Sequence, residues 1–115
     1  MSTHPAHDPN DPRTNYALNP WIPMSCALDL KVIGKLGEET CELGAAIFRC
    51  VIQGVDECEP ITLKPNRQWL TEEVADVLAN IELVTEHFGL DVEAIRARVA
   101  KKKAHLRGWH AMVPT

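Results

Sequence analysis

Residues 33–50 read IGKLGEETCELGAAIFRC, and residues 72–88 read EEVADVLANIELVTEHF. In the first stretch, apolar or small side chains recur at alternating steps of three and four residues, at Ile33, Leu36, Thr40, Leu43, Ile47 and Cys50. The second stretch repeats this spacing at Val74, Val77, Ile81, Val84 and Phe88. Such spacing is typical of the packing seam of an amphipathic helix. The two stretches therefore predict two helices of an all-α bundle that pack along these seams.

Residues at the ends of these stretches predict where the helices begin and stop. Ser25 is a candidate N-cap for a first helix that runs to about Gln53 and ends at Gly54. The segment 54–65 (GVDECEPITLKP) has two prolines and no period, which predicts an irregular loop. A second helix is expected from about Asn66 to His87, with Gly89 as its end. A third is expected from Asp91, a good capping residue, to about Arg107, with Gly108 ending it.

The chain of 115 residues divides into one domain and two short flanks. Five of the eight prolines fall in the first 23 residues, which predicts an irregular arm over residues 1–24. The domain is expected over residues 25–110 and a tail over 111–115. Because aromatic residues make up only 5% of the chain, three helices give a small core. We therefore expect a homodimer or homotetramer to complete the bundle.

Composition excludes several classes of protein. The net charge of −4 argues against a binder of nucleic acid polymers. No apolar run approaches the roughly 20 residues that span a bilayer, and the first residues lack a hydrophobic signal region, so a soluble cytoplasmic protein is expected. Four cysteines without C-x-x-C spacing predict reduced thiols, with neither a zinc site nor a disulfide framework.

Acidic residues stand one position before the seams of both predicted helices. Glu39 and Glu42 precede seam residues of the first helix, and Glu73 and Asp76 precede those of the second. If the helices pack along their seams, these four carboxylates face one another, and their repulsion requires a compensating cation. Oxygen ligands suit Mg²⁺, with Mn²⁺ also possible. Glu38, one turn before Glu42, is a candidate further ligand or base.

Other interpretations of the acids remain open. Glutamates on helices commonly form ion pairs at the surface, and Lys35 and Glu39 have the i,i+4 spacing of such a pair. A di-iron bundle is disfavoured because neither acidic pair has a histidine in Glu-x-x-His spacing.

The residues KLGEETCEL (35–43) and EEVADVL (72–78) resemble the two motifs, E-x-x-E and E-x-x-D, of the MazG-like all-α nucleoside triphosphate pyrophosphohydrolases. The similarity covers roughly residues 25–110, and the chain also resembles the short MazG-like proteins of phages and prophages. It implies Mg²⁺-dependent hydrolysis of a (deoxy)nucleoside triphosphate to a monophosphate and pyrophosphate, which controls or cleanses a nucleotide pool. The metal ligands implied are Glu39, Glu42, Glu73 and Asp76. We expect Glu39 and the neighbouring Glu38, the candidate base, to be the catalytic residues.

The resemblance also indicates where the substrate binds. Relatives often have a basic stretch after the third helix that contacts phosphates, which corresponds here to Lys101, Lys102 and Arg107, although Ala104 stands where an asparagine is usual. Residue chemistry adds Lys35 for a phosphate, Asn80 for a sugar or base, and Trp21 and Trp109 for stacking on a base. An unusual nucleotide such as phosphoribosyl-ATP is an alternative substrate.

The distribution of charge along the chain is also consistent with a second class of function. Residues 91–110 carry six Lys and Arg against two acids, so the rest of the chain carries a net charge of −8. A non-catalytic helical interaction module, whose basic helix binds an acidic partner, has the same distribution. A stabilising response to Mg²⁺ separates the two hypotheses, because only a built metal site binds the ion specifically.

Overall fold

The computed structural model describes Asn10 and residues 21–114, and this part of the chain is all-helical, with three helices and an isolated bridge between Cys58 and Pro65. The helices are α1 (Ala27–Gln53), α2 (Asn66–Phe88) and α3 (Val92–His110). The prediction of an all-α fold is confirmed for this part. The predicted arm falls mostly on residues outside the description. No described helix is both long enough and apolar enough to cross a membrane.

The helix ends agree with the sequence in part. Asp91 caps α3, because its Oδ1 accepts a hydrogen bond of 3.0 Å from the Ala94 backbone N–H. The predicted cap at Ser25 is wrong: α1 begins at Ala27 after Cys26, which makes no side-chain capping bond. The predicted stop at Gly108 is also wrong, since α3 continues to His110; glycine lowers helix propensity without breaking a helix.

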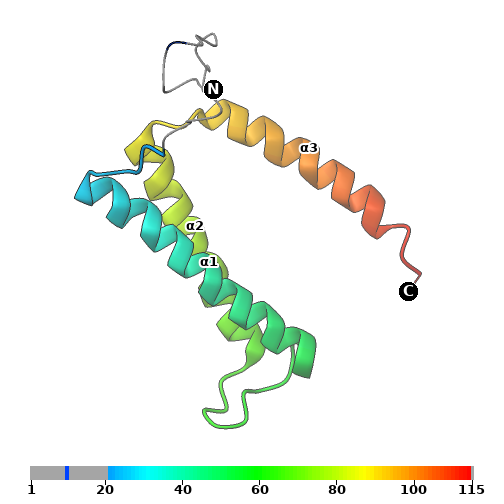
Figure 1. Ribbon diagram of the computed structural model, residues 1–115. Coiled ribbons are helices and arrows are strands. Elements are labelled where there is room, and N and C mark those ends of the chain that lie inside the picture. The colour runs from blue at the N-terminus through cyan, green and yellow to red at the C-terminus, as the bar shows by residue number, and fades with distance from the viewer. Residues whose placement is uncertain (1–9, 11–20, 115) are drawn as a thin grey trace.

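The helices α1 and α2 form an antiparallel hairpin, closed by the loop over residues 54–65 (Figure 1). Asn66 is fully buried and fixes the loop, because its Nδ2 donates to the Gly54 carbonyl at 2.9 Å and its backbone N–H to the Glu57 carbonyl at 2.8 Å. Ala46 and Val84 are the buried apolar residues of the hairpin in the described part. The hairpin is thus held by a narrow line of contact and by its loop.

The line of contact on α1 is not centred on the predicted seam. Its least exposed positions recur at Val32, Leu36, Glu39, Leu43, Ala46 and Cys50, again in steps of three and four. Ile33, Thr40 and Ile47, which the seam prediction placed inside, are exposed. Likewise Val74 and Ile81 of α2 are exposed while Glu73 is half-buried. One residue step turns a helix by about 100°, so a contact line shifted toward Glu39 and Ala46 lies at one edge of the apolar stripe of α1. The helix α2 packs on that edge and leaves the isoleucine edge exposed.

The third helix extends away from the hairpin in Figure 1. Among the described residues, extensive contact between helices is confined to α1 and α2. The radius of gyration is 19.9 Å, whereas a compact domain of similar length has about 13 Å. A single chain therefore leaves much of its helical surface without a partner.

Candidate metal centre

Three carboxylates from two helices converge where α1 and α2 are in contact. Glu39 and Glu42 of α1 and Glu73 of α2 each place a carboxylate oxygen so that the three oxygens lie within 4.8 Å of one another. Glu39 has a side chain only 9% exposed, while Glu42 lies at the edge of the group. The prediction that Glu39 and Glu42 face Glu73 across the helices is confirmed.

The group is incompletely satisfied by the protein. In the described part, four buried side-chain oxygens lack a hydrogen-bond partner, and two of them, Glu39 Oε2 and Glu73 Oε2, belong to this group. Burying a carboxylate oxygen without a partner costs free energy that a bound cation or donor recovers. An all-oxygen set of this kind fits Mg²⁺ or Mn²⁺.

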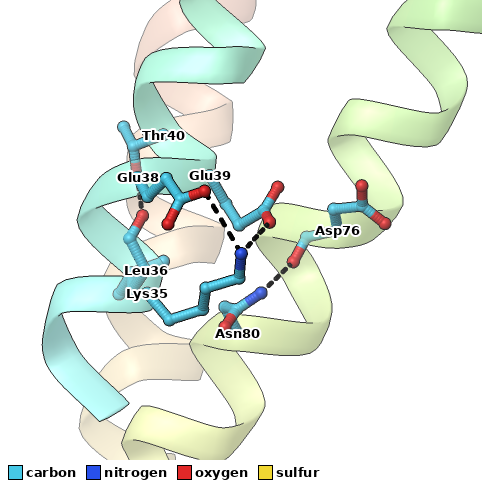
Figure 2. Close-up of polar contacts among 7 residues, drawn as sticks. All are labelled: Lys35, Leu36, Glu38, Glu39, Thr40, Asp76 and Asn80. Carbon is cyan, nitrogen blue, oxygen red and sulfur yellow. Dashed lines mark hydrogen bonds and ion pairs between the residues drawn. The ribbon is translucent and has the colours of Figure 1, made fainter. Parts of the chain in front are cut away.

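The side chain of Lys35 supplies a positive charge to this group of carboxylates. Its Nζ lies 3.2 Å from Glu39 Oε1 and 3.3 Å from Glu38 Oε1 (Figure 2). Both contacts raise the pKa of Lys35 above its ordinary value of 10.5, with the hydrogen bond to Glu39 as the largest cause. Lys35 contacts one oxygen of Glu39 and leaves the other without a partner.

The same crowding acts on Glu42. Its pKa is raised above the ordinary value of 4.5, first by the negative charge of Glu39 and then by the hydrogen bond that a protonated Glu42 makes with Glu39. Desolvation and the charges of Glu73 and Glu38 add to the rise. Repulsion among carboxylates at short range produces a shift of this sign, and a divalent cation opposes it.

Asp76, the fourth predicted ligand, lies one turn after Glu73 but outside the group of three. Its side chain is exposed, and Figure 2 shows the carboxylate pointing away from Glu39. Its backbone carbonyl accepts a bond of 2.8 Å from Asn80 Nδ2. Glu38 is also outside the group, exposed and paired with Lys35. Asp76 remains a candidate ligand and Glu38 a candidate base, but their side chains as arranged here do not reach the group of three carboxylates.

A groove of about 530 Å³ begins at Lys35 and follows the open end of the hairpin. It is lined by Leu28, Lys31, Val32, Lys35, Asn80, Leu83, Glu86 and His87. His87 closes this end through Nε2, which lies 2.6 Å from Asp29 Oδ1. Sequence reasoning named Lys35 and Asn80 but missed Lys31; its position one helical turn before Lys35 is the signal that points to it.

The other predicted substrate contacts are distant from the acids. Lys101, Lys102, Arg107 and Trp109 all lie on α3, which extends away from the hairpin (Figure 1). Trp21 is 94% exposed. Within one chain, the structure therefore brings only Lys35 and Asn80, of the predicted substrate residues, beside the carboxylates.

Comparisons of this chain with protein-family models, with curated proteins and with solved structures found no match.

Proposed function

We propose that this chain is a Mg²⁺-dependent hydrolase that converts a (deoxy)nucleoside triphosphate to the monophosphate and pyrophosphate. The observation that carries the proposal is the convergence of Glu39, Glu42 and Glu73 within 4.8 Å, with two buried oxygens lacking a partner. The resemblance of the two acidic motifs to those of MazG-like enzymes supplies the reaction class. Mn²⁺ is the alternative ion.

The ligands proposed for the cation are Glu39 and Glu73, which are fixed where the helices meet, and Glu42, at the edge. Asp76 joins them as a fourth ligand after a side-chain rotation. When bound, Mg²⁺ supplies charge that neutralises phosphate oxygens and lowers the pKa of a coordinated water. Lys35 then retains Glu38 as its partner and turns its ammonium toward the substrate's phosphates.

The groove beside the acids is the proposed nucleotide site. Its Lys31 and Lys35 suit phosphate oxygens, and its apolar side chains Leu28, Val32 and Leu83 suit a nucleoside. Asn80 offers an amide oxygen to a sugar or base, because its Nδ2 is already engaged with the Asp76 carbonyl. We therefore propose that the α–β anhydride binds where the groove meets the carboxylates, at Lys35.

The chain's own residues then have defined roles in hydrolysis. The oxygen of a water forms a bond to the α-phosphorus, the bond from that phosphorus to the bridging oxygen breaks, and pyrophosphate leaves with the electron pair of that bond. Glu38, exposed and one residue from Glu39, is the proposed acceptor of the water's proton. The lysines stabilise the negative charge on the phosphates.

The test is pyrophosphate release from each of the eight common NTPs and dNTPs with Mg²⁺. We expect pyrophosphate release from one or a few of these nucleotides. Glu73→Gln should reduce the rate at least about 100-fold, because loss of a metal ligand costs at least as much activity as loss of a residue that only hydrogen-bonds to a ligand. Glu72→Gln is the matched control: it alters the neighbouring exposed glutamate, whose partners are Lys64 and Gln68. Equal activity in Glu73→Gln and wild type would contradict the assignment.

If the chain releases no pyrophosphate, its thermal stability with and without Mg²⁺ distinguishes two explanations. Stabilisation by Mg²⁺ without release from any of the eight would favour an unusual nucleotide, such as phosphoribosyl-ATP. Silence with no stabilisation by Mg²⁺ would favour the non-catalytic interaction module.

A further inference from the structure

One face of the hairpin is apolar and has no cover. Glu42, which precedes Leu43 of the contact line on α1, and Glu73, which is half-buried where α2 meets α1, come together on one face of the hairpin. Because the helices are antiparallel, residues that follow the line share the opposite face. This apolar face consists of Ile33, Ile47, Val51, Val74, Leu78 and Ile81, all exposed, with Leu78 at 55% and Ile81 at 38%.

The apolar face lacks charge between Ile33 and Ile47 on α1 and between Leu70 and Ile81 on α2, whereas Arg67, seven residues before Val74 and paired with Asp56, borders it at the Val51 end. Between Ile33 and Ile47 on α1, the residues on this face or at its border with the contact line are Thr40, Leu36 and Leu43. Between Leu70 and Ile81 on α2 they are Val74, Val77 and Leu78. An uncharged apolar patch of this kind is typical of the centre of a protein interface.

The third helix presents a second apolar stripe. Val92, Ile95, Val99, Leu106 and Trp109 follow steps of three and four, interrupted only by Lys102, and Val99 is 47% exposed. Arg96 and Arg107 flank the stripe on one side and Arg98 on the other. The helix thus has the pattern of one that packs on a partner, although it makes no extensive contact in its own chain.

The connection between α2 and α3 holds α3 away from its own hairpin. Gly89 has a φ of 61°, and the Leu90 backbone N–H donates to the Thr85 carbonyl at 3.0 Å. Asp91 then caps α3 through Ala94 N–H. Hydrogen bonds on both sides of this short connection fix the direction in which α3 leaves.

We propose that α3 of a second copy of this chain packs on the apolar face. Charge favours this occupant: residues 27–88 carry five Lys and Arg against twelve acids, whereas α3 carries six against Glu93 alone, giving net charges of −7 and +5. Length agrees too, since 19 residues of α3 extend about 28 Å along the 23 residues, about 35 Å, of α2.

The exchange is reciprocal and closes a two-fold dimer. Each chain gives its α3 to the partner's apolar face and receives the partner's α3 on its own. One kind of contact therefore covers both unpartnered surfaces, whereas two hairpins packed face to face would leave α3 uncovered. The acid group stays open on the opposite face of each hairpin.

The test measures molar mass by light scattering for two pairs of variants of the full chain. We expect wild type to be a dimer, and Leu78→Asp in the apolar face and Val99→Asp in the α3 stripe each to be a monomer with unchanged helical circular dichroism. The controls Ala79→Asp and Ala97→Asp add the same charge on the far sides of the same helices and should remain dimers. Each substitution replaces an exposed residue of the single chain, so the hairpin itself is retained.

Mixing the two monomeric variants makes the test decisive. In a mixture, the unaltered α3 of Leu78→Asp meets the unaltered apolar face of Val99→Asp, so one of the two contacts is intact and a heterodimer should form. A wild-type monomer would overturn the proposal. So would a Val99→Asp dimer, the result for hairpins packed face to face, or a mixture that stays monomeric.

Discussion

Glu39→Leu is expected to stabilise the metal-free chain while removing its response to Mg²⁺. Position 39 lies on the contact line of the hairpin, between Leu36 and Leu43. The remaining residues of this line, from Val32 to Cys50, are all uncharged. The Glu39 side chain is 9% exposed, and one of its carboxylate oxygens contacts Lys35 while the other has no partner. Leucine fits the line and needs no partner.

The magnitude follows from what is lost and gained. Removing a buried polar atom that lacks a partner recovers about 1–3 kcal/mol, and replacing a buried ion pair by apolar groups of similar volume is neutral or stabilising by about 1–4 kcal/mol. Loss of the contact with the exposed Lys35 subtracts little. We expect a net gain of about 1–3 kcal/mol, and each kcal/mol raises the Tm by about 4–8 °C for a domain of this size.

The assay is thermal unfolding followed by circular dichroism, at one chain concentration, in EDTA and again in 10 mM Mg²⁺. Glu38→Leu is the matched control, because Glu38 is the adjacent exposed partner of the same lysine. Its free energy of unfolding should change by about 0.5 kcal/mol or less. Wild type and Glu38→Leu should gain stability from Mg²⁺, and Glu39→Leu should not. A lower Tm for Glu39→Leu in EDTA would refute the reasoning that this carboxylate is unsatisfied without a cation.

Three further predictions concern single residues. The raised pKa of Glu42 means that the folded chain holds this proton more tightly than the unfolded chain, so wild-type stability falls as pH rises from 4.5 through the raised pKa. In EDTA, Glu42→Gln should be more stable than wild type above this pH range and equally stable below it. A difference in stability that does not change with pH would count against charge repulsion at Glu42. Gly34→Ala should stabilise the chain by about 0.5–1 kcal/mol, because its Cβ meets open space inside α1, whereas Gly89→Ala should cost about 1 kcal/mol at a φ of 61°; equal effects in urea unfolding would contradict the assigned conformations. Asp91→Ala should destabilise α3 by about 0.5–2 kcal/mol through loss of its cap, and unchanged amide exchange in α3 would show that the cap is dispensable.

The existence of the helices was predictable because their apolar spacing and end residues act locally. Asp91 caps α3 by a hydrogen bond within one helical turn, and Gly89 adopts a positive φ that few other residues tolerate. Ser25 failed as a cap because α1 starts two residues later, and residue type alone does not decide among neighbouring positions.

The position of the seam was less predictable for a physical reason. Leu36 and Leu43 are flanked on one side by Ile33 and Ile47 and on the other by Glu39 and Ala46, so the spacing alone does not tell which edge meets the neighbouring helix. The structure places Glu39 on the buried edge, and the isoleucines form an apolar face. A sequence shows that a stripe is broad; the number of partners it needs depends on the assembly.

The acid group was largely predictable, since it depends on the register of two helices joined by one loop. The orientation of Asp76 was not, because an exposed side chain rotates freely and nothing in the spacing fixes its rotamer. The placement of Lys101, Lys102 and Arg107 depended on where α3 packs, and α3 makes no extensive contact with the hairpin of its own chain. The single chain therefore does not bring these basic residues to the acid group, and the proposed dimer packs α3 on the opposite face of the hairpin.

The central claim, that Glu39, Glu42 and Glu73 hold a divalent cation, is tested most directly by titrating the metal-free protein with Mn²⁺ and measuring the free ion by electron paramagnetic resonance. The account predicts saturable binding of at least one ion per chain by wild type, Glu38→Gln and Glu72→Gln, displaced by Mg²⁺ and lost in Glu39→Gln and Glu73→Gln. Equal binding by all five proteins, or none by wild type, would contradict it.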